Sequence, residues 1–490
     1  MMRWLKRNRP ILLFAGVALL LAACAHQEPI IIYVTPTPQT EAAQAMTPVS
    51  TAVLPQASVT ATPTVTATGP ASPQPTITFV GPVVGPGYTP PPPPTQAPPP
   101  SATPGAPPTA AAVTTTPAPF TPMPGLDPDR IGVQVHSLLD QAGWDEVLRR
   151  VEQLGVGWAK VQIDWALLQP GGPDEISEDF RRQELYIESL HQRGVKVLVS
   201  VAKAPGWSRS VTNEAGPPDD PQALVRFLEA MLAEFGDAIE AVEVWNEPNL
   251  QREWQGQPLT GASYMRYFDA AHQAIRAYSD RMLVDAKQPR PRPMIIVTAG
   301  LAPTGTSDFS VDDRAYLQQM YDAGLGAYDD VMVGIHPYSW GNPPDARCCN
   351  AVEGQGWDDD PHFFFADNLA DYRDIMERGG HADSQMMVTE FGWATWDGFP
   401  GAAPEEWMAY NDKWAQANYT MRAFEIAQQA GYIGPMLLWN LNFGTLEGRV
   451  EARDERTAYS LLVPLNPAER PLFWMIYDAV RPDVQLPRYD

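Results

Sequence analysis

The amino-acid sequence predicts an α/β fold, a closed (β/α)8 TIM barrel, over residues 126–490. Eight short apolar runs alternate there with amphipathic helical patterns, which is typical of parallel strands connected by helices. Eight such units are the number that closes a barrel. The alternative, an open doubly wound sheet, usually carries a Gly-rich phosphate-binding turn after its first strand, and the stretch IGVQVHSLLDQAG has no such turn.

The predicted strands are runs of six to eight mainly apolar residues, many of them β-branched. In chain order they span 131–136, 158–165, 195–202, 241–247, 294–300, 331–338, 386–391 and 435–441. Each run is short enough for one barrel strand, and the segments between them are long enough for a crossover helix.

The predicted helices carry apolar residues three to four positions apart. The first of them places Val147, Leu148, Val151 and Leu154 on one face and ends at Gly155. The predicted helices span 144–155, 221–236, 264–278, 314–324, 418–431 and 471–480. They separate the strand signals and support parallel pairing.

Residues 1–23 read as a signal rather than as part of the fold. A segment rich in Lys and Arg precedes an apolar run, residues 11–23, that is too short to span a membrane comfortably. The stretch LAAC, residues 21–24, resembles the lipobox of bacterial lipoproteins. That resemblance implies a lipidated Cys24 that anchors the chain to a membrane, with the barrel at the cell surface. An ordinary secretory signal with an incidental cysteine is the alternative.

Residues 24–125 are rich in Pro, Thr, Ala and Gln and nearly free of charge. Such a segment cannot bury a core, so we expect a disordered linker, partly in the polyproline II conformation. The whole chain carries 58 acidic and 34 basic residues, and no basic run follows the signal. This balance argues against a nucleic-acid partner. We expect a monomer.

The chain has three cysteines. If Cys24 carries lipid, Cys348 and Cys349 remain, next to each other in the sequence. An oxidising compartment disfavours free neighbouring thiols. A disulfide between them and a pair of packed thiols both stay open.

Two glutamates stand at matching places in the predicted barrel. Glu247 ends the fourth strand, in AVEVWNEPN, and Glu390 lies at the end of the seventh, in MMVTEF. The C-terminal strand ends meet at the functional face of such a barrel, so both carboxylates can reach one pocket. Two carboxyl groups flanking a pocket are what cleavage of a glycosidic bond requires, one as an acid and one ionised. We expect repulsion and apolar walls to raise the pKa of the acid.

These motifs carry a resemblance. WNEPN and TEFGW are similar to the clan A glycoside hydrolases, and WNEPNL with HPYSW most resembles families 39 and 5. The resemblance implies that Glu247 is the general acid/base and Glu390 the nucleophile of a mechanism that retains the anomeric configuration. The two carboxyl groups should then lie about 5–5.5 Å apart.

The same resemblance implies roles for further residues. Asn246 would bind the sugar 2-hydroxyl, Trp439 would form the aromatic floor of the subsite, and Tyr338 would hold the nucleophile. His336 and His136 would belong to the polar network beneath the sugar. Trp207 is a further candidate for substrate binding, because tryptophans gather at the predicted strand ends.

Lys160 marks a departure from the clan, whose members often place an arginine in the second strand. A lysine lacks the guanidinium fork, so the orientation of Glu390 would differ. Lys160 is either a site residue or a core lysine paired with Asp164.

The sequence thus predicts a retaining O-glycoside hydrolase that acts on polysaccharide or oligosaccharide outside the cell. The alternatives are a carbohydrate-binding pseudoenzyme and a transglycosylase on the same barrel. No cofactor is expected, and no metal either, because the chain has neither H-E-x-x-H nor H-x-H. The identity of the sugar stays open.

Overall fold

The structure is a computed structural model that describes residues 125–285, 289–349, 359–465 and 467–481. The predicted signal, the lipid site at Cys24 and the linker up to residue 124 lie outside these described residues. Among the helices within the described ranges, none is both long and apolar enough to cross a membrane.

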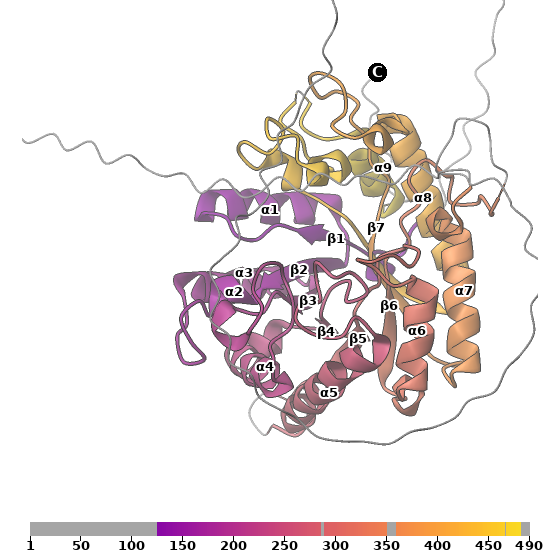
Figure 1. Cartoon of the computed structure of the whole chain (residues 1–490). Helices are drawn as coiled ribbons and strands as arrows, with labels where there is room; N and C mark the ends of the chain where they lie inside the picture. Colours follow the sequence, from indigo (N-terminus) through magenta and orange to yellow (C-terminus); the bar gives the residue numbers. More distant parts are fainter. Residues whose placement is uncertain (1–124, 286–288, 350–358, 466, 482–490) are drawn as a thin grey trace, which may run out of the picture. The chain divides into compact units, whose positions relative to one another are not determined.

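Eight parallel strands close into a barrel in the order β1 to β8, which confirms the predicted fold (Figure 1). Each strand pairs with the next one in sequence, and β1 pairs with β8 to close the sheet. The strands are β1 (Ile131–Val135), β2 (Trp158–Asp164), β3 (Lys196–Ala202), β4 (Ala241–Val244), β5 (Ile295–Thr298), β6 (Val331–Ile335), β7 (Met386–Phe391) and β8 (Ile433–Leu438).

Strand β4 is shorter than predicted. Its regular pairing stops at Val244, because Trp245 has φ of +80° and Glu247 has φ of +41°. Side chains other than glycine rarely adopt this left-handed region, and such residues tend to gather at functional sites. Asn246 and Glu247 therefore lie in a sharp turn beyond the strand rather than in the sheet.

The helices lie outside the barrel, as Figure 1 shows for α4 to α7. They are α1 (Gln141–Leu154), α2 (Trp165–Leu168), α3 (Glu178–His191), α4 (Pro221–Phe235), α5 (Gly261–Leu283), α6 (Asp313–Asp322), α7 (Phe365–Arg378), α8 (Lys413–Gln429) and α9 (Pro471–Ala479). The predicted helices did not include α2, α3 or α7. The start of α3 nevertheless has a capping signal, since the Ser177 side chain accepts a hydrogen bond from the backbone N–H of Phe180.

The interior of the barrel changes from apolar to charged along the strands. One buried apolar cluster consists of Trp158, Leu198, Ala241, Val297, Met387 and Leu437. Of these, Trp158, Ala241 and Met387 lie at the starts of β2, β4 and β7. Two residues further along their strands stand Lys160, Glu243 and Thr389, all fully buried. Because strand side chains alternate with a period of two, these groups point into the barrel above the apolar cluster. They form the base on which the site is built.

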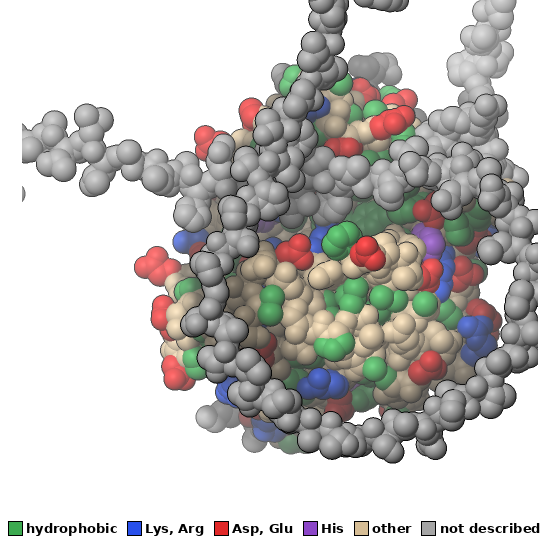
Figure 2. All heavy atoms as spheres, viewed as in Figure 1, with side chains coloured by type: hydrophobic (Ala, Val, Ile, Leu, Met, Phe, Trp, Pro, Cys, Tyr) green, Lys and Arg blue, Asp and Glu red, His purple; other side chains and the backbone are tan. Residues whose placement is uncertain are grey.

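The surface of the domain carries mixed charge. On the face that Figure 2 shows, the Lys and Arg side chains of the described residues are scattered among acidic ones rather than gathered into one patch. A concentrated basic stripe is the usual electrostatic footprint for nucleic-acid phosphates, and this face does not present one.

Candidate active site

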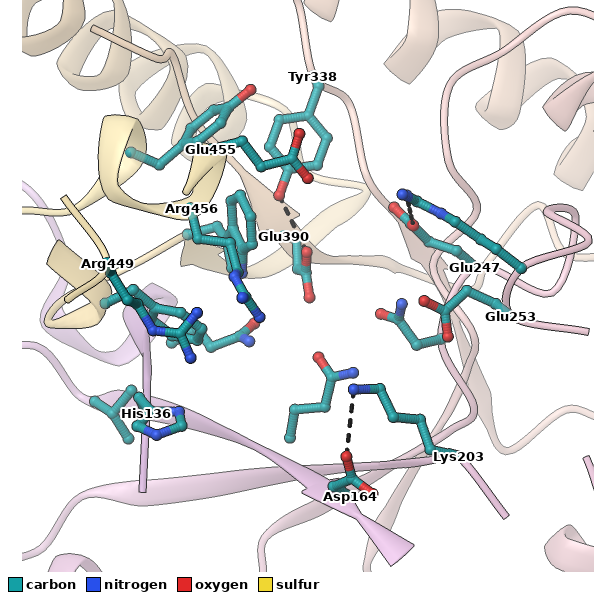
Figure 3. A pocket seen from close by; sticks show the side chains of 18 of the residues that line it. His136, Asp164, Lys203, Glu247, Glu253, Tyr338, Glu390, Arg449, Glu455 and Arg456 are labelled. Atoms are coloured by element: carbon teal, nitrogen blue, oxygen red, sulfur yellow. Dashed lines mark hydrogen bonds and ion pairs between the residues drawn. The ribbon is translucent and has the colours of Figure 1, made fainter. Parts of the chain in front are cut away.

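A cavity of about 420 Å³ lies at the C-terminal ends of the strands (Figure 3). Its wall is formed by the ends of β1, β2 and β7 and by the loops after β3 to β8. The predicted site residues that line it are His136, Asn246, Glu247, Tyr338, Glu390 and Trp439. The closed barrel thus brings together residues from segments as distant in sequence as β1 and β8.

Glu390 projects into the cavity from the end of β7, and two partners hold its carboxylate. Lys160 Nζ lies 2.9 Å from Oε1, and the Tyr338 hydroxyl donates to Oε2 at 3.0 Å. Burial and the charge of Glu390 raise the pKa of Tyr338 well above its usual value, so the phenol stays a hydrogen-bond donor. Each carboxylate oxygen therefore has its own partner, which orients the group.

Lys160 is fully buried and bridges two carboxylates. Besides Glu390, its Nζ lies 2.9 Å from Glu243 Oε2. The alternative pairing with Asp164 is wrong, because Asp164 instead pairs with Lys203 at 3.3 Å on the cavity wall. Asp164 ends β2, four residues beyond Lys160, which separates it from the barrel interior where Lys160 lies. Burial acts to lower the pKa of Lys160, but Glu243 and Glu390 raise it above its usual value, so the amine keeps its charge.

Glu243 is a site residue that the sequence analysis missed. It lies on β4, fully buried, and burial alone would raise the pKa of its carboxyl group. The charges of Lys160 and His336 outweigh burial and lower that pKa well below its usual value. A signal was present in the sequence, since a glutamate in the middle of an apolar barrel strand must be paired when buried.

Glu247 has two partners that favour its charged form. His336 Nδ1 lies 3.1 Å from Oε1, and an Arg252 guanidinium nitrogen lies 3.4 Å from Oε2. Burial acts to raise the pKa of Glu247, but His336 and Arg252 outweigh burial and lower it. The expected rise in the pKa of the acid is therefore wrong for the free protein, because two cationic groups from other parts of the chain lie beside this carboxylate.

His336 lies between Glu247 and Glu243. Its Nε2 contacts Thr389 Oγ1 at 3.0 Å and lies 3.8 Å from Glu243 Oε1. Burial acts to lower the pKa of His336, but Glu390, Glu243 and Glu247 raise it to about 9. The imidazole is therefore protonated at neutral pH.

These contacts form one chain of alternating charges beneath the cavity. It runs through Glu390, Lys160, Glu243, His336 and Glu247, with separations of 2.9, 2.9, 3.8 and 3.1 Å. Every buried charge has an opposite neighbour, as burial requires. The chain, which we call the charge relay base, holds both candidate catalytic carboxylates in defined positions.

The remaining predicted residues line the cavity with polar and aromatic surface. Asn246 is buried, and its Oδ1 has no hydrogen-bond partner within the described part of the chain. The Trp439 ring lies edge-on to Tyr338, with centroids 6.0 Å apart. Burial and the positive charges of Arg449 and Arg456 lower the pKa of His136 to about 4, so this imidazole is neutral.

Trp207 is not among the residues that line the cavity. Its indole Nε1 donates to the Gln169 carbonyl at 2.7 Å, and its ring lies edge-on to Trp165. The structure therefore gives Trp207 a packing role at the base of the loop after β3, apart from the residues above.

The loops add cavity residues that sequence reasoning did not find. They include charged and aromatic side chains, namely Lys203, Arg252, Glu253, Phe363, Trp407, Arg449, Glu455, Arg456 and Tyr459. Arg449 and Arg456 both bind Asp454, and Figure 3 shows them on the side of the cavity opposite Glu247. Loop residues carry no periodic pattern in the sequence. Only the closed barrel shows that these side chains line one cavity.

Two other predictions concern sulfur and metal. The structure records a disulfide between the neighbouring residues Cys348 and Cys349. Outside the cavity, Asp312, Asp313 and His362 place possible ligand atoms within 4.8 Å of one another. Both ring nitrogens of His362 already contact carboxylates, those of Asp312 and Asp360. This cluster is an ion-pair network that links the start of α6 to the loop before α7.

Comparisons with known proteins give fold-level results. A scan against protein-family models finds no match, and a search of curated proteins finds none either. Among solved structures, a family 39 glycoside hydrolase from Bacteroides cellulosilyticus WH2 matches with a TM-score of 0.52 at 16% identity. The match covers 72% of this chain and 64% of that protein, so it spans less than two thirds of the relative's length.

Two glucosidases are also similar in structure. One from Croceicoccus marinus has a TM-score of 0.48 at 12% identity, over 74% of this chain and 69% of that one. A β-glucosidase from Exiguobacterium marinum has a TM-score of 0.46 at 13% identity, over 73% and 99%. The first match, to the family 39 enzyme, shows that this chain shares its fold with a glycoside hydrolase of one of the families that WNEPNL and HPYSW resemble.

Proposed function

We propose that this protein is a retaining O-glycoside hydrolase that cleaves polysaccharide or oligosaccharide outside the cell. The observation that supports this best is the charge relay base, which holds Glu390 and Glu247 at one cavity. A protein that only binds sugar needs aromatic surface and hydrogen-bond donors. It does not need two carboxylates held by buried cations, whose desolvation is costly.

In the first step, Glu390 attacks the anomeric carbon and forms a glycosyl ester while Glu247 protonates the departing oxygen. Lys160 and Tyr338 keep Glu390 oriented for attack. Glu247 must gain a proton for this step. The imidazolium of His336, 3.1 Å away, is placed to supply it.

In the second step, the ionised Glu247 removes a proton from water, and that water releases the sugar from Glu390. The lowered pKa of Glu247 keeps this carboxylate ionised in the free protein, so the group is in the form that accepts a proton. The shielded Oδ1 of Asn246 would accept a hydrogen bond from the sugar 2-hydroxyl. If a sugar hydroxyl replaces water in this step, the same residues perform transglycosylation.

The decisive experiment uses Glu390→Gln and Glu390→Gly on a panel of aryl glycosides and polysaccharides. We expect both variants to lose turnover, the Gln variant to keep oligosaccharide binding, and azide to restore cleavage in the Gly variant. The exposed Glu214, outside the cavity lining, provides the matched control Glu214→Gln. Undiminished turnover in the Glu390 variants contradicts the assignment, and binding without turnover in the wild type favours the pseudoenzyme.

We also propose that lipid on Cys24 holds the protein at the cell surface, with residues 24–125 as a spacer. The order of charged segment, apolar run and LAAC supports this. Cys24→Ser should abolish incorporation of a labelled fatty acid and release the protein from the membrane fraction. A membrane-bound, unlabelled wild type would contradict the lipid anchor.

A further inference from the structure

Glu253 lies on the cavity wall beside Glu247 (Figure 3), and the two steps described above do not use it. Its Oε2 atom is shielded from solvent and has no hydrogen-bond partner in the described part of the chain. A buried polar atom without a partner destabilises a protein by about 1–3 kcal/mol. A ligand that enters the cavity with a hydroxyl group would supply the missing partner.

The backbone of Glu253 is held by hydrogen bonds, so the fold fixes where its side chain begins on the cavity wall. Its carbonyl accepts a hydrogen bond from the indole of Trp245 at 2.9 Å, and its N–H donates to Leu250 at 3.1 Å. The next residue, Trp254, is fully buried against Trp245. Groups positioned in this way lose little entropy on binding a ligand.

The charges around Glu253 favour its neutral form. Burial and the negative charges of Glu247 and Glu390 outweigh the positive charges of Arg252 and Lys203 and raise the pKa of Glu253 to about 7. Below that pH the group is a carboxylic acid, which can both donate a hydrogen bond to a hydroxyl group and accept one. It then adds no second negative charge beside Glu247.

We propose that Glu253 is a specificity-determining residue that hydrogen-bonds a hydroxyl group of the sugar on the leaving-group side of the scissile bond. This inference rests on the proposed function, because the acid Glu247 defines that side. In Figure 3, Glu253 and Glu247 share one side of the cavity, and Glu390 projects between them and the side of Arg449 and Arg456. The sugar that becomes attached to Glu390 thus lies away from Glu253, and the sugar that departs lies beside it.

The test compares two substrates of the same sugar, a nitrophenyl glycoside and a disaccharide, chosen as a pair that the wild-type protein cleaves. Only the disaccharide has hydroxyl groups on its leaving group. Glu253→Ala should lower kcat/KM for the disaccharide about tenfold or more and leave that for the nitrophenyl glycoside within about threefold, since one hydrogen bond is lost in the first case alone.

A pH profile provides a second readout. In the wild type, KM for the disaccharide should rise as pH passes through about 7, where Glu253 ionises. Glu253→Gln cannot ionise and keeps a donor, so its KM should stay flat over the same range. The control Glu214→Gln changes an exposed acid on the loop that contacts Gln255, and it should behave as the wild type on both substrates.

Equal losses on both substrates, or a KM in Glu253→Gln that still rises with pH as in the wild type, would overturn the inference while leaving the proposed function intact. Binding separates the two further. Disaccharide affinity is measured for Glu390→Gln with and without Glu253→Ala, and this requires no cleavage. Weaker binding in the double variant supports the role of Glu253 even if the wild type cleaves nothing, whereas equal binding contradicts it.

Discussion

Replacing Lys160 by methionine tests the charge relay base most directly. Lys160 is fully buried and lies 2.9 Å from both Glu243 and Glu390, so the change leaves two carboxylates around an apolar side chain of similar length. Removing one partner of a buried pair costs about 3–5 kcal/mol, mainly because the remaining charge is buried without compensation. We expect a loss of this size in the free energy of unfolding at neutral pH, together with a loss of turnover.

The assay is urea unfolding, followed by tryptophan fluorescence. With a slope of about 3 kcal/mol per molar urea, the midpoint should fall by about 1 M or more. The control is Lys203→Met, because the Lys203 side chain is 43% exposed and 3.3 Å from Asp164. An exposed pair contributes at most about 1 kcal/mol, so the control should shift the midpoint much less.

The loss of unfolding free energy in Lys160→Met should depend on pH. In the wild type Lys160 helps to lower the pKa of Glu243, so the stability that the pair contributes persists until the pH falls through that lowered value. In Lys160→Met the buried carboxyl group of Glu243 favours its neutral form. Protonation at lower pH then removes the cost of burying its charge. The deficit should therefore shrink between about pH 7 and pH 5, and adding Glu243→Gln should recover part of it. A deficit as small as that of Lys203→Met, or one independent of pH, would refute the reasoning.

Three further predictions follow from single contacts. Tyr338→Phe removes the donor 3.0 Å from Glu390 Oε2 and should lower kcat for an aryl glycoside about tenfold or more with little change in the unfolding midpoint; unchanged kcat would show that the hydroxyl does not serve the nucleophile. His336→Gln should be less stable than the wild type at pH 6 and approach it as pH rises through about 9, because a raised pKa stabilises the fold only while the group is protonated; urea midpoints across this range measure it, and a constant gap would contradict the charged imidazole. Asn246→Ala should reduce kcat more than KM if its shielded Oδ1 binds the 2-hydroxyl in the transition state, and steady-state kinetics that show a change in KM alone would argue against that role.

Local patterns were sufficient to predict the strands and the placement of both glutamates. The apolar runs marked all eight strands, and the resemblance singled out Lys160, which the structure buries in the barrel. The ends of strands were predicted less well. β4 stops at Val244 because Trp245 and Glu247 take left-handed conformations, and no local propensity predicts those for Trp or Glu.

Other parts of the site could not be predicted from local patterns. Burial and repulsion alone led us to expect a raised pKa for Glu247. His336, which follows β6, and Arg252 lower this pKa instead. Glu243 looked like one polar residue in an apolar strand until the closed barrel placed it between Lys160 and His336.

The sequence by itself determined the alternation of strands and helices, the two carboxylates at strand ends and the chemistry that such a pair can perform. These features are local, because side-chain periodicity and turn residues act over a few positions of the chain. Only the tertiary structure decided which charges meet, and hence that Glu390 and Glu247 are joined through Lys160, Glu243 and His336. The physical reason is that electrostatic energy in a buried site depends on distances of a few ångströms between groups far apart in sequence, and those distances exist only once the barrel has closed.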